Sequence, residues 1–164
     1  MAFDKSPLER LQAISDDFEV WWDASPLVYS AWKEKYLKEI PAEKRDKFAG
    51  WVEKLYNEQK PEDSVFRGVT TNPRLTRETL DWIPEACKPW IKEIKEKHAG
   101  ASLEEQAWMT YTKITEEGVK KYLPIFEKSN YKYGHVSAQV DPRLITDTRE
   151  MLRQGIGLKA LSPN

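Results

Sequence analysis

One junction occurs twice in this chain. Residues 68–75 read GVTTNPRL, and residues 138–144 read AQVDPRL. In each stretch a short apolar run ends at Asn or Asp, and Pro-Arg-Leu and a helical pattern follow. Asn and Asp are preferred helix N-caps, and proline is favoured at the first helical position. Both stretches therefore predict a strand that passes directly into a helix, which is the repeating unit of a parallel α/β sheet.

A third strand is predicted nearer the N-terminus. Residues 18–22 read FEVWW, a run of high β-propensity that Asp23 closes. The other two strands are expected at about residues 65–71 and 134–140, and helical patterns fill the long intervals between the three. The order of strand, helices, strand, helices, strand, helix predicts an α/β fold with a parallel sheet.

Several helix boundaries can be predicted from proline and glycine. An N-terminal helix is expected within residues 1–17, and residues 41–60 read as one long helix because their apolar positions recur at helical spacing. Residues 73–98 are helical too, with breaks expected at Pro84 and Pro89, since a proline inside a helix loses a hydrogen bond and clashes with the preceding turn.

The last two helices carry their own signals. Ser102 with Glu105 three residues later predicts a capping box at the start of the next helix. The final helix is expected to begin at the second copy of the repeated junction and to end at Gly155 and Gly157.

Charge and composition exclude several classes of function. The chain has 26 basic and 27 acidic residues and a formal net charge of −1, which gives no electrostatic basis for binding nucleic acid or an anionic membrane. With one cysteine and two histidines, it offers no internal disulfide and no metal-ligand cluster. No apolar run approaches the ~20 residues of a membrane span, and residues 1–10 lack the apolar segment of a secretory signal. We therefore expect a soluble cytoplasmic protein.

Polar side chains are expected to meet at one edge of the sheet. The polar residues of the third strand alternate onto one face: His135, Ser137 and Gln139. A strand with one polar and one apolar face, under helices, suits the lumen of a barrel better than a doubly wound core. Carboxyl ends of parallel strands lie at the same edge, where α/β proteins build their sites. That edge should carry a strand-end site of four residues: Asp23, Thr70, Asn72 and Gln139.

Three stretches taken together resemble a known enzyme family. WWDAS at residues 21–25, then GVTTNPRL, then GHVSAQVDPRL at residues 134–144 are similar, in this order, to the transaldolase family of class I aldolases. The resemblance covers roughly residues 18–164. It implies an α/β fold of the (β/α)8 TIM-barrel type, of which this chain carries only the first three βα units and extra helices. Residues 18–164 are then the N-terminal part of the barrel, preceded by the helix in residues 1–17.

The resemblance also implies a chemistry and residue roles. In the family, a lysine forms a Schiff base with a ketose phosphate, and a dihydroxyacetone unit passes to an aldose phosphate without metal or cofactor. By motif match, Asp23 takes the place of the aspartate that transfers a proton during carbon–carbon cleavage. Asn72 takes the place of the asparagine that hydrogen-bonds the dihydroxyacetone moiety, with Thr70 a lesser candidate beside it. Gln139 stands where most transaldolases have a water-orienting glutamate and where the related fructose-6-phosphate aldolases also have glutamine.

The Schiff-base lysine is expected outside this chain. In the family it lies on the fourth strand, soon after the helix that begins at DPRL, whereas here that helix is followed by GIGLKALSPN. Lys159 is the only lysine nearby, and it lacks the apolar strand context that would lower the pKa of its amine. The resemblance therefore implies a chain continuation or a second polypeptide that completes the barrel and supplies the lysine, so that this chain alone is incomplete and inactive. The alternative is a non-catalytic homologue that acts as a binding or assembly module.

Two residues of the strand-end site have simpler explanations. Asp23 precedes Ala-Ser-Pro and can serve as a turn or capping residue. Asn72 precedes a proline, so an N-cap accounts for it unaided, and one amide cannot fully satisfy both a cap and a substrate. Gln139 has no such explanation, because a buried glutamine at a strand end needs hydrogen-bond partners.

Overall fold

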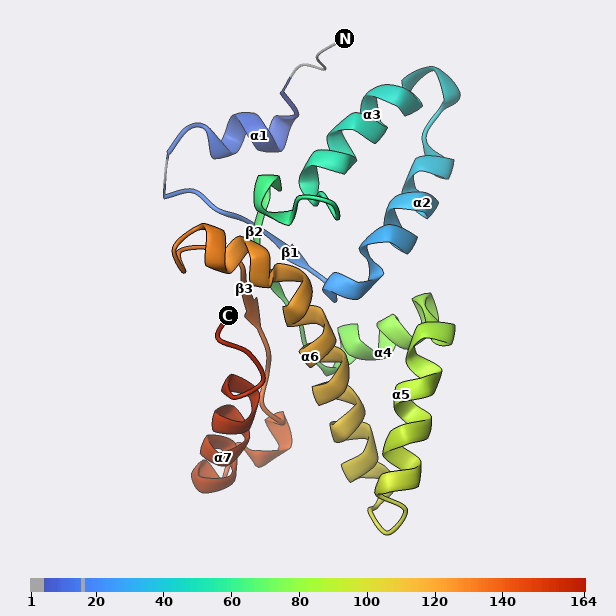
Figure 1. Ribbon diagram of the computed structural model, residues 1–164, viewed down its shortest axis with the longest axis vertical. Coiled ribbons are helices and arrows are strands. Elements are labelled where there is room, and N and C mark those ends of the chain that lie inside the picture. The colour runs from blue at the N-terminus through green and yellow to red at the C-terminus, as the bar shows by residue number, and fades with distance from the viewer. Residues whose placement is uncertain (1–4, 16) are drawn as a thin grey trace.

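The chain folds as an α/β domain built on a parallel sheet (Figure 1). The computed structural model describes residues 5–15 and 17–164; Met1–Asp4 and Asp16, which belong to the expected N-terminal helical segment, lie outside the described residues. Its sheet contains three strands in the order β1 (Val20–Asp23), β2 (Phe66–Thr70) and β3 (His135–Ser137). Both strand pairs are parallel, so the expected α/β class and parallel sheet are confirmed.

Helices occupy the intervals between the strands. Their bounds are α1 Pro7–Gln12, α2 Tyr29–Glu39, α3 Ala42–Leu55, α4 Pro73–Trp82, α5 Pro84–Lys97, α6 Leu103–Lys128 and α7 Thr148–Lys159. Short 3₁₀ turns join some of them: η1 Pro26–Val28, η2 Pro61–Asp63 and η3 Pro142–Leu144. Among these helices, none is both long and apolar enough to cross a membrane.

The helix caps follow the sequence where the signal is local. Ser102 and Glu105 form the expected capping box of α6: the serine Oγ accepts from the Glu105 N–H at 3.2 Å, and the Glu105 carboxylate accepts from the Ser102 N–H at 2.8 Å. The break between α4 and α5 lies at Pro84, since Ile83 before it leaves the helical region, with φ −133° and ψ 54°. Both features depend on a few neighbouring residues only.

Other boundaries differ from the sequence expectation. Pro89 does not break the chain again and lies inside α5. The helix expected over residues 41–60 ends at Leu55, because Tyr56 turns to an extended conformation and enters the core, where it is 2% exposed. Gly155 does not end α7, which continues to Lys159. The expectation that Gly157 ends that helix is wrong as well, because α7 continues past it although glycine is disfavoured in a helix interior.

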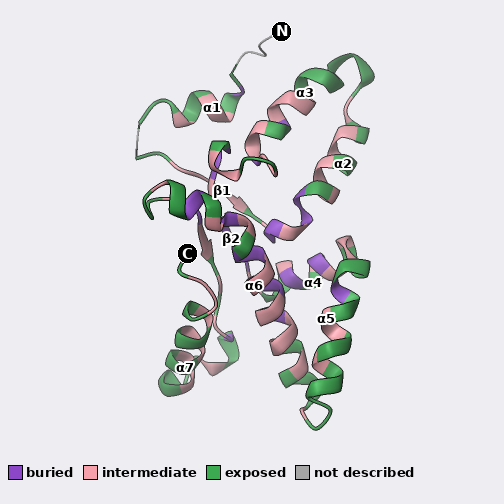
Figure 2. Ribbon diagram, in the orientation of Figure 1, coloured by how far each residue is buried: buried purple, intermediate pink, exposed green. Residues whose placement is uncertain are grey.

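The buried core lies on one face of the sheet, where purple ribbon gathers in Figure 2. Val69 of β2 is fully buried there and pairs with Trp22 of β1 and Val136 of β3. Aromatic side chains from the helices cover these strands, and the Tyr56 and Tyr122 rings stack at 5.1 Å. The members of the cluster are Tyr29, Val52, Tyr56, Phe66, Val69, Tyr122 and Ile125. The opposite face of the sheet is left for the polar residues.

Both edges of the sheet are open within residues 5–15 and 17–164. β2 is the central strand, and β1 and β3 each pair with β2 alone. β3 is also shorter than the expected strand at residues 134–140, because residues 138–140 leave the ladder. Three parallel strands do not close a barrel, so the expected (β/α)8 barrel is not formed by the described residues.

Candidate active site

The carboxyl ends of β1 and β2 bring two of the expected site residues into direct contact. Asp23, Thr70 and Ser137 are paired across the three strands. The Thr70 hydroxyl donates to the Asp23 carboxylate, with 2.7 Å between Oγ1 and Oδ1. Both side chains lie on the sheet face opposite the core. The geometry therefore joins residues that are 47 positions apart, with one carboxylate oxygen of Asp23 left for another partner.

Trp21, Gly68 and His135 form the next row of the same face. The Trp21 ring lies directly over Gly68, where an added Cβ would come within 2.8 Å of three ring carbons. The Trp21 and His135 rings are stacked, with 6.5 Å between their centroids. The His135 and Phe126 rings meet edge to face, with 5.2 Å between their centroids. Glycine at position 68 is therefore required by the tryptophan, and the histidine is held by aromatic packing beneath the Asp23–Thr70 pair.

Asn72 uses the oxygen of its amide as a helix cap. Its Oδ1 accepts from the Leu75 N–H at 2.9 Å and caps α4, as the sequence predicts. Its Nδ2 makes no hydrogen bond to the part of the chain that the structure describes, and an amide nitrogen carries two donors. The cap therefore uses only the oxygen end, and the nitrogen end stays free for a ligand.

Gln139 is held by a residue that sequence reasoning missed. The Tyr111 hydroxyl accepts from the Gln139 N–H at 2.8 Å and donates to the Gln139 carbonyl at 3.0 Å. Tyr111 lies on α6 and is 3% exposed, and burial raises the pKa of its hydroxyl. The Gln139 side chain is exposed, contrary to the expectation of a buried glutamine, and it hydrogen-bonds to none of the described residues. The backbone is thus fixed after the strand has ended, while the side-chain amide faces solvent.

No sequence signal identified Tyr111. It falls at a helical apolar position of α6 and reads as an ordinary core residue. Its role arises from the contact between α6 and the end of β3, which are 28 residues apart along the chain.

Lys159 lies away from the strand-end site. It is the last residue of α7, and its amine donates to the Pro163 carbonyl at 2.6 Å. Together with Val136 and Ala138 it lines a small cavity of about 200 Å³ on the core side of β3. Since Val136 points away from the face that carries Asp23 and Thr70, the lysine is on the other side of the sheet.

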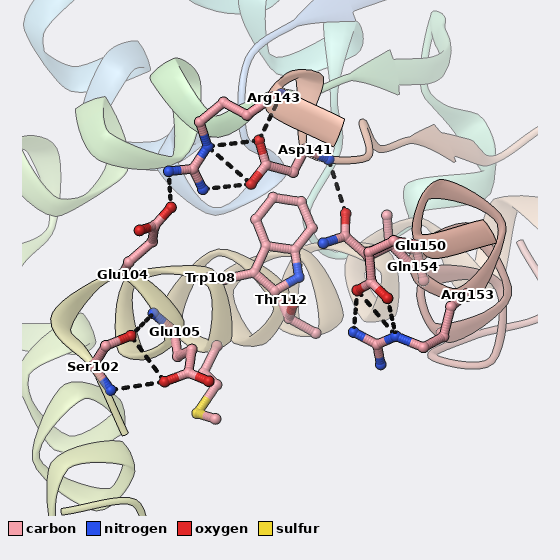
Figure 3. Close-up of a pocket in the computed structure, with 13 residues that line it drawn as sticks. Ser102, Glu104, Glu105, Trp108, Thr112, Asp141, Arg143, Glu150, Arg153 and Gln154 are labelled. Atoms are coloured by element: carbon pink, nitrogen blue, oxygen red, sulfur yellow. Dashed lines mark hydrogen bonds and ion pairs between the residues drawn. The ribbon is translucent and has the colours of Figure 1, made fainter. Parts of the chain in front are cut away.

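A larger cavity, of about 740 Å³, lies between α6, η3 and α7 (Figure 3). Its charged groups pair with one another. Arg143 binds Asp141 and also Glu104, and Arg153 binds Glu150. Asp141 also caps η3 by accepting from the Arg143 N–H at 2.9 Å, so its expected capping role is observed.

Metal ligation has no evident site in the described part of the chain. There, no group of three or more His, Cys, Asp or Glu side chains is arranged to hold an ion. The strand-end site contains one carboxylate, that of Asp23, and three other groups that can form hydrogen bonds, those of Thr70, Asn72 and Gln139.

Comparison with models of protein families gives a match. The model of the family described as Transaldolase/Fructose-6-phosphate aldolase matches residues 52–163. The matched segment includes Thr70, Asn72 and Gln139, whereas Asp23 precedes it. Searches of curated proteins and of solved structures returned no significant match.

Proposed function

Because the chain belongs to the transaldolase/fructose-6-phosphate aldolase family, we propose that its strand-end site is part of a Schiff-base aldolase centre. In this proposal a dihydroxyacetone unit is transferred between sugar phosphates. The lysine that binds the ketose comes from a continuation of the chain or from a partner subunit that completes the barrel. The chain described here contributes Asp23, Thr70, Asn72 and Gln139.

The observation that carries the proposal is the hydrogen bond between Asp23 and Thr70. Cleavage of the carbon–carbon bond in a ketose Schiff base requires a base for the proton of the hydroxyl on the bond's far carbon, which leaves as an aldehyde while the electron pair of the bond passes to the iminium. Thr70 donates to Oδ1 of Asp23 and thereby fixes the carboxylate, so that Oδ2 can take this proton and later return it. The bond thus orients a general base at the strand ends, where α/β barrels carry out their chemistry.

Asn72 and Gln139 complete the proposed site by hydrogen bonding. The free Nδ2 donors of Asn72 would hold the hydroxyl groups of the three-carbon unit, because the oxygen of this amide already caps α4. Gln139 would orient a water molecule with its exposed side chain. Glutamine donates and accepts hydrogen bonds but exchanges no proton, so Asp23 is the only acid–base group among the four residues.

The position of Lys159 supports a nucleophile from outside this chain. A Schiff-base lysine must reach the same ligand as Asp23, whereas Lys159 lies on the core side of β3 at the end of a helix. The open edge of β3 provides unpaired backbone groups on which a further parallel strand can add.

Side-chain amide signals test ligand binding. The chain is labelled with ¹⁵N at asparagine and glutamine and titrated with fructose 6-phosphate. We expect the Asn72 and Gln139 amide signals to shift together. Asn57 should not respond, because its oxygen binds the Gln59 and Lys60 N–H groups before β2, at the other end of the sheet.

A conservative variant separates the cap from the ligand contact. Asn72→Asp keeps an oxygen for the Leu75 N–H but removes both Nδ2 donors, so binding should weaken about tenfold without loss of α4. Asn57→Asp is the matched control and should bind like the native chain. Absence of any shift at Asn72 and Gln139 in the native chain would contradict the proposal and favour the non-catalytic binding or assembly module.

Borohydride trapping locates the nucleophile. The chain is incubated with fructose 6-phosphate, reduced with borohydride and weighed intact by mass spectrometry. The proposal predicts no adduct on this chain alone. An adduct that maps to a lysine here, with Lys159 the first to replace, would show that the nucleophile is internal.

A further inference from the structure

A third cavity, next to Asn72 and Tyr111, is lined mainly by apolar side chains. It is bounded by α4, α5, α6 and η3, and its volume of about 550 Å³ is within the range of small-molecule sites. The three helices contact one another and lie side by side in Figure 1. Its apolar lining is Pro73, Leu80, Ile91, Ala107, Trp108, Tyr111 and Pro142.

Two aromatic rings give the cavity a wall suited to a planar ligand. The Trp108 and Tyr111 rings lie 4.9 Å apart and are tilted by 40°. Leu80 from α4 and Ile91 from α5 contribute aliphatic surface to the same cavity. Aromatic groups bind well in such surroundings, because they bury a large apolar area with few rotatable bonds.

Among the described residues that line the cavity, one cation has no partner. Arg143 is neutralised by Asp141 and Glu104, as Figure 3 shows. Arg77 of α4 also lines the cavity, and its guanidinium forms neither a hydrogen bond nor an ion pair with any described residue. Its neighbour Arg74, one turn earlier on α4, pairs with Glu78 at 3.1 Å and does not line the cavity. The two arginines and two carboxylates that line the cavity sum to zero, and Arg77 is the arginine whose guanidinium is left to pair with a ligand.

We propose that this cavity binds a small aromatic carboxylate, with its ring against Trp108 and Tyr111 and its carboxylate paired with Arg77. The inference does not depend on the proposed function. It places a ligand against Tyr111, the residue that holds the Gln139 backbone, and against Pro73, which follows Asn72. Such a ligand contacts Tyr111 and Pro73, which adjoin the strand-end residues Gln139 and Asn72, without occupying the strand ends themselves.

The test compares a charged probe with its neutral isostere. Binding of 4-fluorophenylacetate and of 4-fluorophenylacetamide to the native chain is measured by ¹⁹F NMR. We expect saturable binding of both, with the carboxylate bound more tightly. Arg77→Gln should weaken the carboxylate about threefold to fivefold, the range for an exposed ion pair, and leave the amide within about twofold.

Two further variants locate the site. Ala107→Trp fills the cavity from α6 and should reduce binding of both probes at least about tenfold. Ile91→Phe narrows the cavity from α5 and gives the same test if the first variant does not fold. Arg74→Gln removes a charge of the same sign from the same helix outside the cavity, so it should leave both affinities within about twofold.

Three results would overturn the proposal. The first is an absence of saturable binding of either probe to the native chain. The second is unchanged binding in a folded cavity-filling variant, which would assign the probes to other exposed apolar surface, such as Leu152 and Ile156 of α7. The third is equal affinity for the two probes together with no effect of Arg77→Gln, which would refute a carboxylate ligand.

Discussion

Tyr111→Phe tests whether one side chain fixes the backbone at Gln139. The substitution keeps the buried ring and removes only the hydroxyl. That hydroxyl forms two hydrogen bonds, one from the Gln139 N–H at 2.8 Å and one to the Gln139 carbonyl at 3.0 Å. Residues 138–140 lie beyond the end of β3, so the ladder gives them no alternative partner there.

The magnitude follows from these two bonds. A typical intramolecular hydrogen bond contributes about 1 kcal/mol net, because water replaces it in the unfolded chain. Gln139 is exposed, so water can reach its backbone groups once the hydroxyl is gone. We therefore expect the free energy of unfolding to fall by about 2 kcal/mol rather than by the larger penalty of a buried unpaired group. For a chain of this size that loss lowers Tm by about 4–8 °C.

Two measurements check this prediction. Urea denaturation followed by circular dichroism gives the free energy of unfolding, and amide hydrogen exchange reports the Gln139 N–H directly. Tyr131→Phe is the matched control, because Tyr131 is 63% exposed and its hydroxyl bonds to none of the described residues. The free energy of unfolding of this variant should differ from that of the native chain by less than about 0.5 kcal/mol. The prediction is refuted if Tyr111→Phe and the native chain unfold at the same urea concentration and hydrogen exchange at the Gln139 N–H is not faster in the variant. The Tyr111 hydroxyl then does not fix this backbone.

Three other perturbations have expected outcomes. Thr76→Val should leave the free energy of unfolding unchanged or raise it by about 1 kcal/mol, as measured by urea denaturation. The reason is that the buried Thr76 hydroxyl oxygen has no hydrogen-bond partner among the described residues. A lower free energy of unfolding in the variant would show that the hydroxyl does have a partner. Gly134→Ala should cost about 2 kcal/mol or more in the same assay, because Gly134 has φ +85° and a Cβ would lie 2.4 Å from the Phe126 nitrogen; native stability would contradict this geometry. The free energy of unfolding should also fall as pH rises above about 10. Burial raises the pKa of several tyrosines in the folded chain, whereas the same tyrosines ionise near their ordinary pKa in the unfolded chain. Denaturation at pH 8 and at pH 11 measures the difference. These tyrosines are Tyr29, Tyr56, Tyr111 and Tyr122.

Local patterns were sufficient for much of the architecture. The first copy of the repeated junction correctly predicted that a strand ends before Asn72 and that this residue caps α4. At the second copy the expected helix start was wrong: β3 ends at Ser137, Pro142 begins only the short turn η3, and α7 begins at Thr148. Alternation along the strands predicted that polar residues share one face, and Asp23 and Thr70 do meet there. The assignment of catalytic and binding roles to these residues stays a prediction, because position alone does not show what a side chain binds.

Propensity failed at three helix positions. Pro89 and Gly155 both stay inside helices, although each is unfavourable in a helix interior. Tyr56 ends α3 early because burial against Tyr122 outweighs one more turn of an exposed helix. For Tyr56 the competing contact comes from a residue distant in the chain, which a local pattern does not contain.

The sequence by itself determined the three parallel strands, their order along the chain, the caps at Asn72 and Ser102 and the family, because these depend on residue type and on spacing over a few positions. Only the tertiary structure decided which side of the sheet faces the core, and it placed Lys159 on that side, away from Asp23 and Thr70. It also revealed that Tyr111 holds Gln139 and that Arg77 borders an apolar cavity. Such relations join residues that are far apart in sequence, and they exist only when the packing of several helices against the sheet fixes the distance between them.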